Sequence, residues 1–179
     1  MLKLCLIAAC LLTTLPAAAY ESSTRAAYII PNWDTYLRAL MLPPLPAALQ
    51  HDSSLFRFAA TAAWQPPVFI WIETFDDGRL ARVTRMAALD PKGNGTYSRG
   101  PVTSRTLSDA DLGPFRAAFK AAKLCAAPLA GQIGNDGFTY NFEFANATRY
   151  CAATRWAPLD GDPFAVLGQA TLALAQPLK

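Results

Sequence analysis

Alternating apolar and polar residues recur along the chain and predict strands. Phe138 to Ala145 alternates aromatic side chains with polar ones, the period-two pattern of a strand with one buried face. Val68 to Phe75 is β-branched or aromatic almost throughout, and the following Asp77-Gly78 is typical of a hairpin turn because it tolerates positive φ angles. Gln65-Pro66-Pro67 should separate this strand from the one expected before it. We expect strands over 55–64, 68–75, 79–87, 96–106, 138–145 and 148–156.

Apolar residues at helical spacing mark three further segments. Residues 32–41 carry them at i, i+3, i+4, i+7 and i+8, and Pro43 ends the pattern. Ser108 begins a helix to about residue 124 as its cap, with acids in the first turn. Residues 164–175 are so apolar that we expect a buried helix. The chain is therefore expected to be an α+β protein, an antiparallel β-sheet built from hairpins with two or three helices packed on one face.

The first nineteen residues have the three-part plan of a secretory signal peptide. Lys3 supplies a positive charge, an apolar stretch follows to Leu15, and Ala17-Ala18-Ala19 offers small residues for cleavage after Ala19. The alternative is a lipoprotein signal with lipidation at Cys10, although the apolar stretch before that residue is short. We predict a periplasmic or secreted protein with one domain over 20–179, comprising an N-terminal arm over 20–54 and an α+β core over 55–179.

Composition narrows the classes of function. The 179 residues are 53% hydrophobic and 16% charged, so they have enough apolar surface for a packed core. The net charge is only +3 without a run of Lys or Arg, which argues against a nucleic-acid surface. One His and the lack of a paired-Cys motif argue against a zinc site, and we expect no metal and no cofactor. No segment of the mature chain is long and apolar enough for a transmembrane span.

Two cysteines remain after the predicted signal peptide, Cys125 and Cys151. In an exported protein two cysteines most simply form one disulfide, here between the end of a helix and a strand. The alternative is a reactive thiol, which needs a base beside it. The only histidine, His51, lies in a polar connection, so the sequence favours the disulfide.

Glu73 and Glu143 are the first candidates for chemistry, because both lie inside aromatic strands. A carboxylate-dependent hydrolase needs two acids across a cleft, and Asp136 is a third candidate. The structural alternative is that each Glu faces an Arg across a strand pair. Asp77-Gly78 as a two-residue turn places Glu73 opposite Arg82 and Ile72 opposite Val83. Glu143 faces Arg149 across a three-residue turn over 145–147, or Tyr150 across a two-residue Asn146-Ala147 turn.

A second set of candidates comes from the segment Asp136-Gly137-x-x-Tyr140-x-x-Glu143 and the later Arg155-Trp156-x-Pro158. Together they resemble a pattern in uncharacterised bacterial secreted proteins, a resemblance that covers about 25 residues and implies no known activity. Asp136, Glu143, Arg155 and Trp156 are candidates for binding a ligand, and Arg155-Trp156 is alternatively a packing anchor. Trp71 and Tyr140 are further candidates for contacts with a ligand or partner.

These observations favour an exported binding or interaction protein. Its expected partner is another envelope or extracellular protein, or a cell-wall component. The alternatives are a carboxylate-dependent hydrolase acting on an envelope or extracellular substrate, and a structural envelope protein. The sequence favours binding because acid–base side chains are scarce while aromatic ones are frequent.

Overall fold

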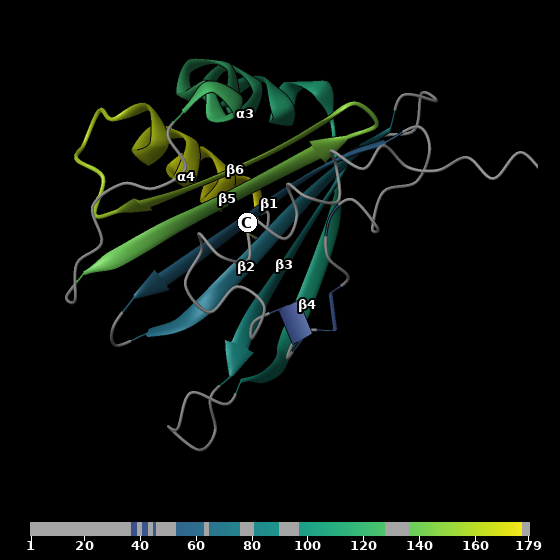
Figure 1. Cartoon of the computed structure of the whole chain (residues 1–179). Helices are drawn as coiled ribbons and strands as arrows, with labels where there is room; N and C mark the ends of the chain where they lie inside the picture. The colour runs from purple at the N-terminus through teal and green to yellow at the C-terminus, as the bar shows by residue number, and fades with distance from the viewer. Residues whose placement is uncertain are drawn as a thin grey trace, which may run out of the picture.

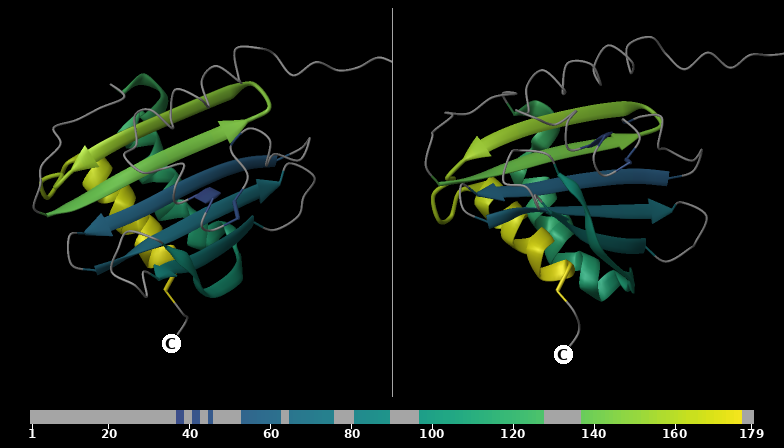
Figure 2. Two further views of the ribbon diagram at one scale, coloured as in Figure 1. Left: turned by 60° about the horizontal axis from the view of Figure 1, so that its bottom comes forward. Right: turned by 90° about the horizontal axis from the view of Figure 1, so that it is seen from below.

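The part of the chain that the structure describes forms a six-stranded antiparallel sheet with helices α3 and α4 packed on one of its faces (Figures 1 and 2). The computed structural model describes residues 37, 38, 41, 42, 45, 53–62, 65–75, 81–89, 97–127 and 137–176. The strands are β1 (Ser53–Ala62), β2 (Gln65–Phe75), β3 (Ala81–Leu89), β4 (Ser98–Leu107), β5 (Phe138–Asn146) and β6 (Arg149–Trp156). Their spatial order is β4-β3-β2-β1-β5-β6, so the expected α+β fold with antiparallel hairpins is confirmed.

The β2–β3 hairpin has the register that the sequence predicts. Glu73 is paired with Arg82 and Ile72 with Val83. The expected interruption at 65–67 was wrong, because β2 begins at Gln65 and includes both prolines. Those prolines precede the ladder with β3, which begins at the pair of Val68 with Ala87, and they lie beside a register shift in the ladder with β1. A strand tolerates proline at such a beginning, where a missing N–H breaks no central ladder.

The β5–β6 hairpin differs from both of the registers expected for it. Its turn is Ala147-Thr148, Asn146 is paired with Arg149, and Glu143 therefore faces Ala152. The Asn146 Oδ1 accepts a hydrogen bond of 3.1 Å from the backbone N–H of Thr148. This hydrogen bond forms an Asx turn, in which the asparagine side chain binds the backbone two residues later. It explains why the two residues of the hairpin turn come directly after Asn146.

The two helices begin where side-chain caps are available. Helix α3 (Asp109–Ala122) begins with the predicted cap Ser108, which forms a reciprocal capping box with Asp111. The short 3-10 helix η1 (Leu124–Ala126) follows it, and the expected disulfide joins Cys125 of η1 to Cys151 of β6 with a Cα–Cα distance of 4.9 Å. Helix α4 (Pro163–Leu174) is capped by Asp162. No helix among the described residues is long and apolar enough to cross a membrane.

The main core lies between the sheet and the two helices. Phe56, Phe58 and Ile70 from the sheet pack there with Phe115 of α3 and Leu167 of α4. The face opposite α3 and α4 carries the alternate residues of each strand and is buried in part by Leu37 and Leu45. Most of the helix expected over 32–41 lies outside the described residues, although Leu37 and Arg38 are helical.

Candidate functional site

Two features stand out, and the first is a buried ion pair on the face opposite α3 and α4. Arg57 of β1 and Glu143 of β5 are directly paired across the ladder. The Arg57 Nη1 lies 3.6 Å from the Glu143 Oε2, and the two side chains are only 5% and 3% exposed. Burial lowers the pKa of Arg57, and the charge of Glu143 opposes that shift.

Tyr150 completes this cluster from β6. Its hydroxyl donates a hydrogen bond of 2.6 Å to the Glu143 Oε1. Burial raises the pKa of Tyr150, and the neighbouring Glu143 carboxylate raises it further, so the phenol keeps its proton and remains a donor. Both Glu143 oxygens thus lie against groups that stabilise the carboxylate, and the three side chains hold β1, β5 and β6 together.

The prediction that Glu143 forms an ion pair with a cross-strand arginine is therefore confirmed, but the arginine is Arg57 and not Arg149. Tyr150 is not directly opposite Glu143 in the ladder, although its hydroxyl reaches the carboxylate. The arginine comes from β1, a strand more than 80 residues earlier, and a local hairpin argument cannot find it. Glu73 lies on the same face as Glu143, but β1 separates their strands. Glu73 is half-buried and is paired with Arg82 in the ladder.

The structure distributes the ligand-binding residues expected from the sequence over two faces. Trp71 and Trp156 share the face opposite α3 and α4 with Glu143, as the strand registers show. Tyr140 and Arg155 are paired with each other on the helix-covered face, so Arg155 and Glu143 are not brought together. Asp136 lies outside the described residues.

Arg155 has the contacts of a packing anchor. Its guanidinium carbon lies 4.0 Å from the centre of the Phe164 ring, a cation–π contact with the first turn of α4. Its Nη1 donates a hydrogen bond of 2.7 Å to the carbonyl oxygen of Thr154. Burial lowers the pKa of Arg155, whereas the charge of Asp162 raises it. These contacts join β6 to α4 and leave the ligand role of Arg155 a prediction.

The second feature is a cavity of about 490 Å³ that we call the end pocket. It lies on the helix-covered side, where β1 ends, β2 and β5 begin and the last turns of α4 pass over the sheet. Its walls are mainly apolar, with polar side chains at Arg85, Tyr140 and Gln65. The pocket is lined by Ala60, Thr61, Ala62, Gln65, Pro66, Val68, Arg85, Gly137, Phe138, Tyr140 and Leu172.

Tyr140 is positioned in this pocket by a glycine of α4. A Cβ atom at Gly168 would overlap the Tyr140 ring, so the absence of a side chain there lets the ring lie directly on the helix. The ring also packs on Phe58, with ring centroids 5.1 Å apart. Partial burial raises the pKa of the Tyr140 hydroxyl, which therefore stays a neutral donor at ordinary pH.

Arg85 lies on the core-facing side of β3, between Ile70 of β2 and Thr103 of β4. It lines the end pocket and also a second cavity of about 460 Å³, which we call the β4 groove. The groove lies between the end of α4 and the edge of the sheet. It is lined by Val83, Arg85, Ala87, Pro101, Thr103, Ser104, Arg105, Ala175 and Gln176.

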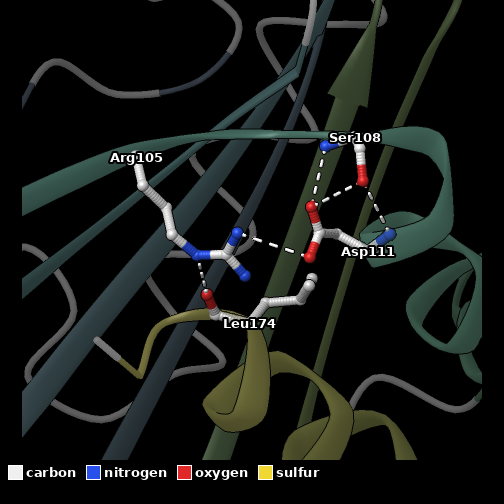
Figure 3. A network of polar contacts seen from close by, with 4 residues as sticks. All are labelled: Arg105, Ser108, Asp111 and Leu174. Carbon is white, nitrogen blue, oxygen red and sulfur yellow. Dashed lines mark hydrogen bonds and ion pairs between the residues drawn. The ribbon is translucent and has the colours of Figure 1, made fainter. Parts of the chain in front are cut away.

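Arg105, the other cation of the β4 groove, serves the fold (Figure 3). Its Nε donates a hydrogen bond of 3.0 Å to the carbonyl oxygen of Leu174, at the last turn of α4. Its Nη1 lies 3.4 Å from the Oδ1 of Asp111, the same carboxylate that closes the Ser108 capping box. Arg105 thereby joins the beginning of α3 to the end of α4 from strand β4.

The described lining of the end pocket includes no Asp, Glu, His or Cys side chain. Among the described residues no group of three or more His, Cys, Asp or Glu side chains is arranged to hold a metal ion. Sequence reasoning missed this site, since it named no ligand-binding candidate in the strand expected over 79–87. The sequence did contain a sign of this site. Arg85 is two residues from Val83 and four from Ala81, so in a strand its charged side chain shares their apolar face.

A scan against protein-family models and a search of curated proteins each found no match for this chain.

Proposed function

We propose that this protein is an exported binding protein whose ligand site is the end pocket. The observation that carries the proposal is the pocket itself. Its volume of about 490 Å³ lies within the range of small-ligand sites, and its apolar walls hold only a few polar groups. The predicted signal peptide and the Cys125–Cys151 disulfide are consistent with export to an oxidising compartment.

The hydrolase alternative has less support. It requires Glu143 to reach a substrate, but Glu143 is buried against Arg57 and Tyr150. Its proposed partner Glu73 is two strands away in the sheet, and neither carboxylate lines the end pocket. The predicted envelope or cell-wall partner stays a prediction, and the proposed site narrows it to a partner that presents a small apolar group.

The proposal is tested with the neutral dye aminoanthracene, whose fluorescence rises in an apolar site. We expect saturable binding to the mature, oxidised protein. Ala62→Trp places a large ring at a half-buried position in the pocket lining and should weaken dye binding by about tenfold or more, since the ring occupies ligand volume. Thr106→Trp adds the same ring at an exposed position of β4 outside the pocket and should leave the affinity unchanged.

Thermal unfolding of both variants provides the fold control. Equal loss of affinity in the two tryptophan variants, or dye binding that does not saturate, would contradict the proposal. Glu73→Gln tests the hydrolase alternative. It should leave dye affinity unchanged while abolishing any carboxylate-dependent hydrolysis.

A further inference from the structure

Arg85 occupies a position where a charged side chain is unusual. Its strand partners are Ile70 and Thr103, and the row continues through Phe58 and Phe142 in the main core. The side chain is half-buried and lines two cavities beside the end of α4. Burying a charged side chain without a partner costs free energy. A cation on the core face therefore needs contact with water or with an opposite charge.

Arg57 and Arg105, two other arginines on or near the core, have acidic partners. Arg57 faces Glu143, and Arg105 contacts Asp111 and the end of α4. Within the described part of the chain, no acidic side chain forms an ion pair with Arg85, and none lines either cavity beside it. The guanidinium is therefore placed between two cavities with its hydrogen-bonding capacity available to a ligand.

We infer that the end pocket takes a small amphiphilic carboxylate, whose head group binds Arg85 and whose apolar body lies against Ala60, Val68 and Leu172. The inference rests on the proposed function and adds the chemistry of the head group. A guanidinium presents parallel N–H donors that match the two oxygens of a carboxylate. The three apolar residues pack against the main core and line the same pocket, so they form a ready surface for an alkyl or aromatic body.

Tyr140 offers a second hydrogen-bond donor within the same pocket. Its hydroxyl belongs to a ring that Gly168 and Phe58 hold in place, and the residue lines the same pocket as Arg85. Gln65 supplies a further polar side chain at the lining. Two cationic or neutral donors without an acid in the described lining favour an anion over a cation of the same shape.

The test compares octanoate with n-octanol and octylamine as displacers of aminoanthracene from the mature protein. All three have the same alkyl body, so differences report the head group. We expect octanoate to displace the dye at about tenfold lower concentration than n-octanol, and octylamine to be the weakest. Arg85→Gln should remove the advantage of octanoate over n-octanol. Arg82→Gln removes the same charge from the opposite face of β3 and should keep that advantage.

Arg85→Lys provides a second variant of the same site. It keeps the charge without the planar fork, so octanoate should retain only part of its advantage. Circular dichroism of each variant establishes that it is folded. Equal displacement by octanoate and n-octanol from the wild type, or an unchanged octanoate advantage in folded Arg85→Gln, would overturn the inference and leave the proposed function standing. Failure of the dye itself to bind would instead refute the proposed function.

The carboxylate has two possible sources, a fatty acid or the end of a short apolar peptide. The tripeptide Leu-Phe-Ala with a free carboxyl end, compared with its amidated form, separates them. Displacement by octanoate alone supports fatty acids, and displacement by the free but not the amidated peptide supports peptide ends. Displacement by amidated and free peptide alike would contradict recognition of a carboxylate.

Discussion

Replacing Glu143 by Gln removes one charge of the buried pair while nearly conserving its shape. At 3.6 Å and an effective dielectric constant of about 20, the attraction between the two charges is about 4–5 kcal/mol. Burial of each ion costs several kcal/mol, so the intact pair is close to balanced. In Glu143→Gln the cost for Arg57 remains while the attraction is lost. We expect the free energy of unfolding to fall by about 3–5 kcal/mol.

Urea denaturation of the oxidised protein, followed by tryptophan fluorescence, measures this change. Arg57→Met should be similarly destabilising because it leaves the Glu143 charge buried without its opposite charge. The double variant should be more stable than the sum of the two single losses predicts, since neither charge then remains. Glu73→Gln, a half-buried control, should cost about 1 kcal/mol or less. Additive losses, or a change below about 0.5 kcal/mol in Glu143→Gln, would refute the reasoning.

Three further outcomes follow from the structure. Replacing Cys125 and Cys151 together by Ser should lower the free energy of unfolding by about 3–4 kcal/mol in urea, because the bridge spans 26 residues of sequence; an unchanged midpoint would contradict this. The pKa of Tyr150 is raised by burial, so the stability it contributes is complete below about pH 10, the unfolded value, and is lost as the pH rises above it. Tyr150→Phe should therefore flatten the alkaline decline of the unfolding temperature, and equal slopes would argue against the shift. Gly168→Ala should destabilise the protein by about 1–3 kcal/mol despite the better helix propensity of Ala, and should weaken dye binding because the Tyr140 ring must move; a gain in stability would exclude the contact.

The local patterns of the chain predicted most of its elements. Alternation found β5, the Asp-Gly turn placed Glu73 opposite Arg82, and the capping residues placed the start of α3 at Ser108. These signals succeed because they arise from neighbours within a few residues. Neither turn expected between β5 and β6, over 145–147 or at Asn146-Ala147, is the observed one, Ala147-Thr148. The hydrogen bond from the Thr148 N–H to the Asn146 side chain favours the observed turn, and the alternation of β5 alone does not reveal it.

The site was less accessible to sequence reasoning because its parts are distant in the chain. Arg57 and Glu143 meet only through the pairing of β1 with β5, and the end pocket combines residues from 60 to 172. Tyr140 was predicted as a contact residue and lines the pocket, but its predicted companion Glu143 lies on the other face. Arg85 carries the clearest signal in retrospect, an arginine on the apolar side of a strand.

The central position of β1 has a consequence for the order in which the chain can acquire its structure. One edge of β1 pairs with β2, which follows almost immediately, but the other pairs with β5, which begins at residue 138. A chain that emerges N-terminus first can assemble the β1–β4 meander while the second edge of β1 still has open N–H and C=O groups. Until the last 42 residues, 138–179, arrive, this intermediate presents an apolar strand edge to other chains. We therefore expect aggregation during synthesis or refolding to respond to substitutions in β5 that slow its docking, even where the finished protein tolerates them.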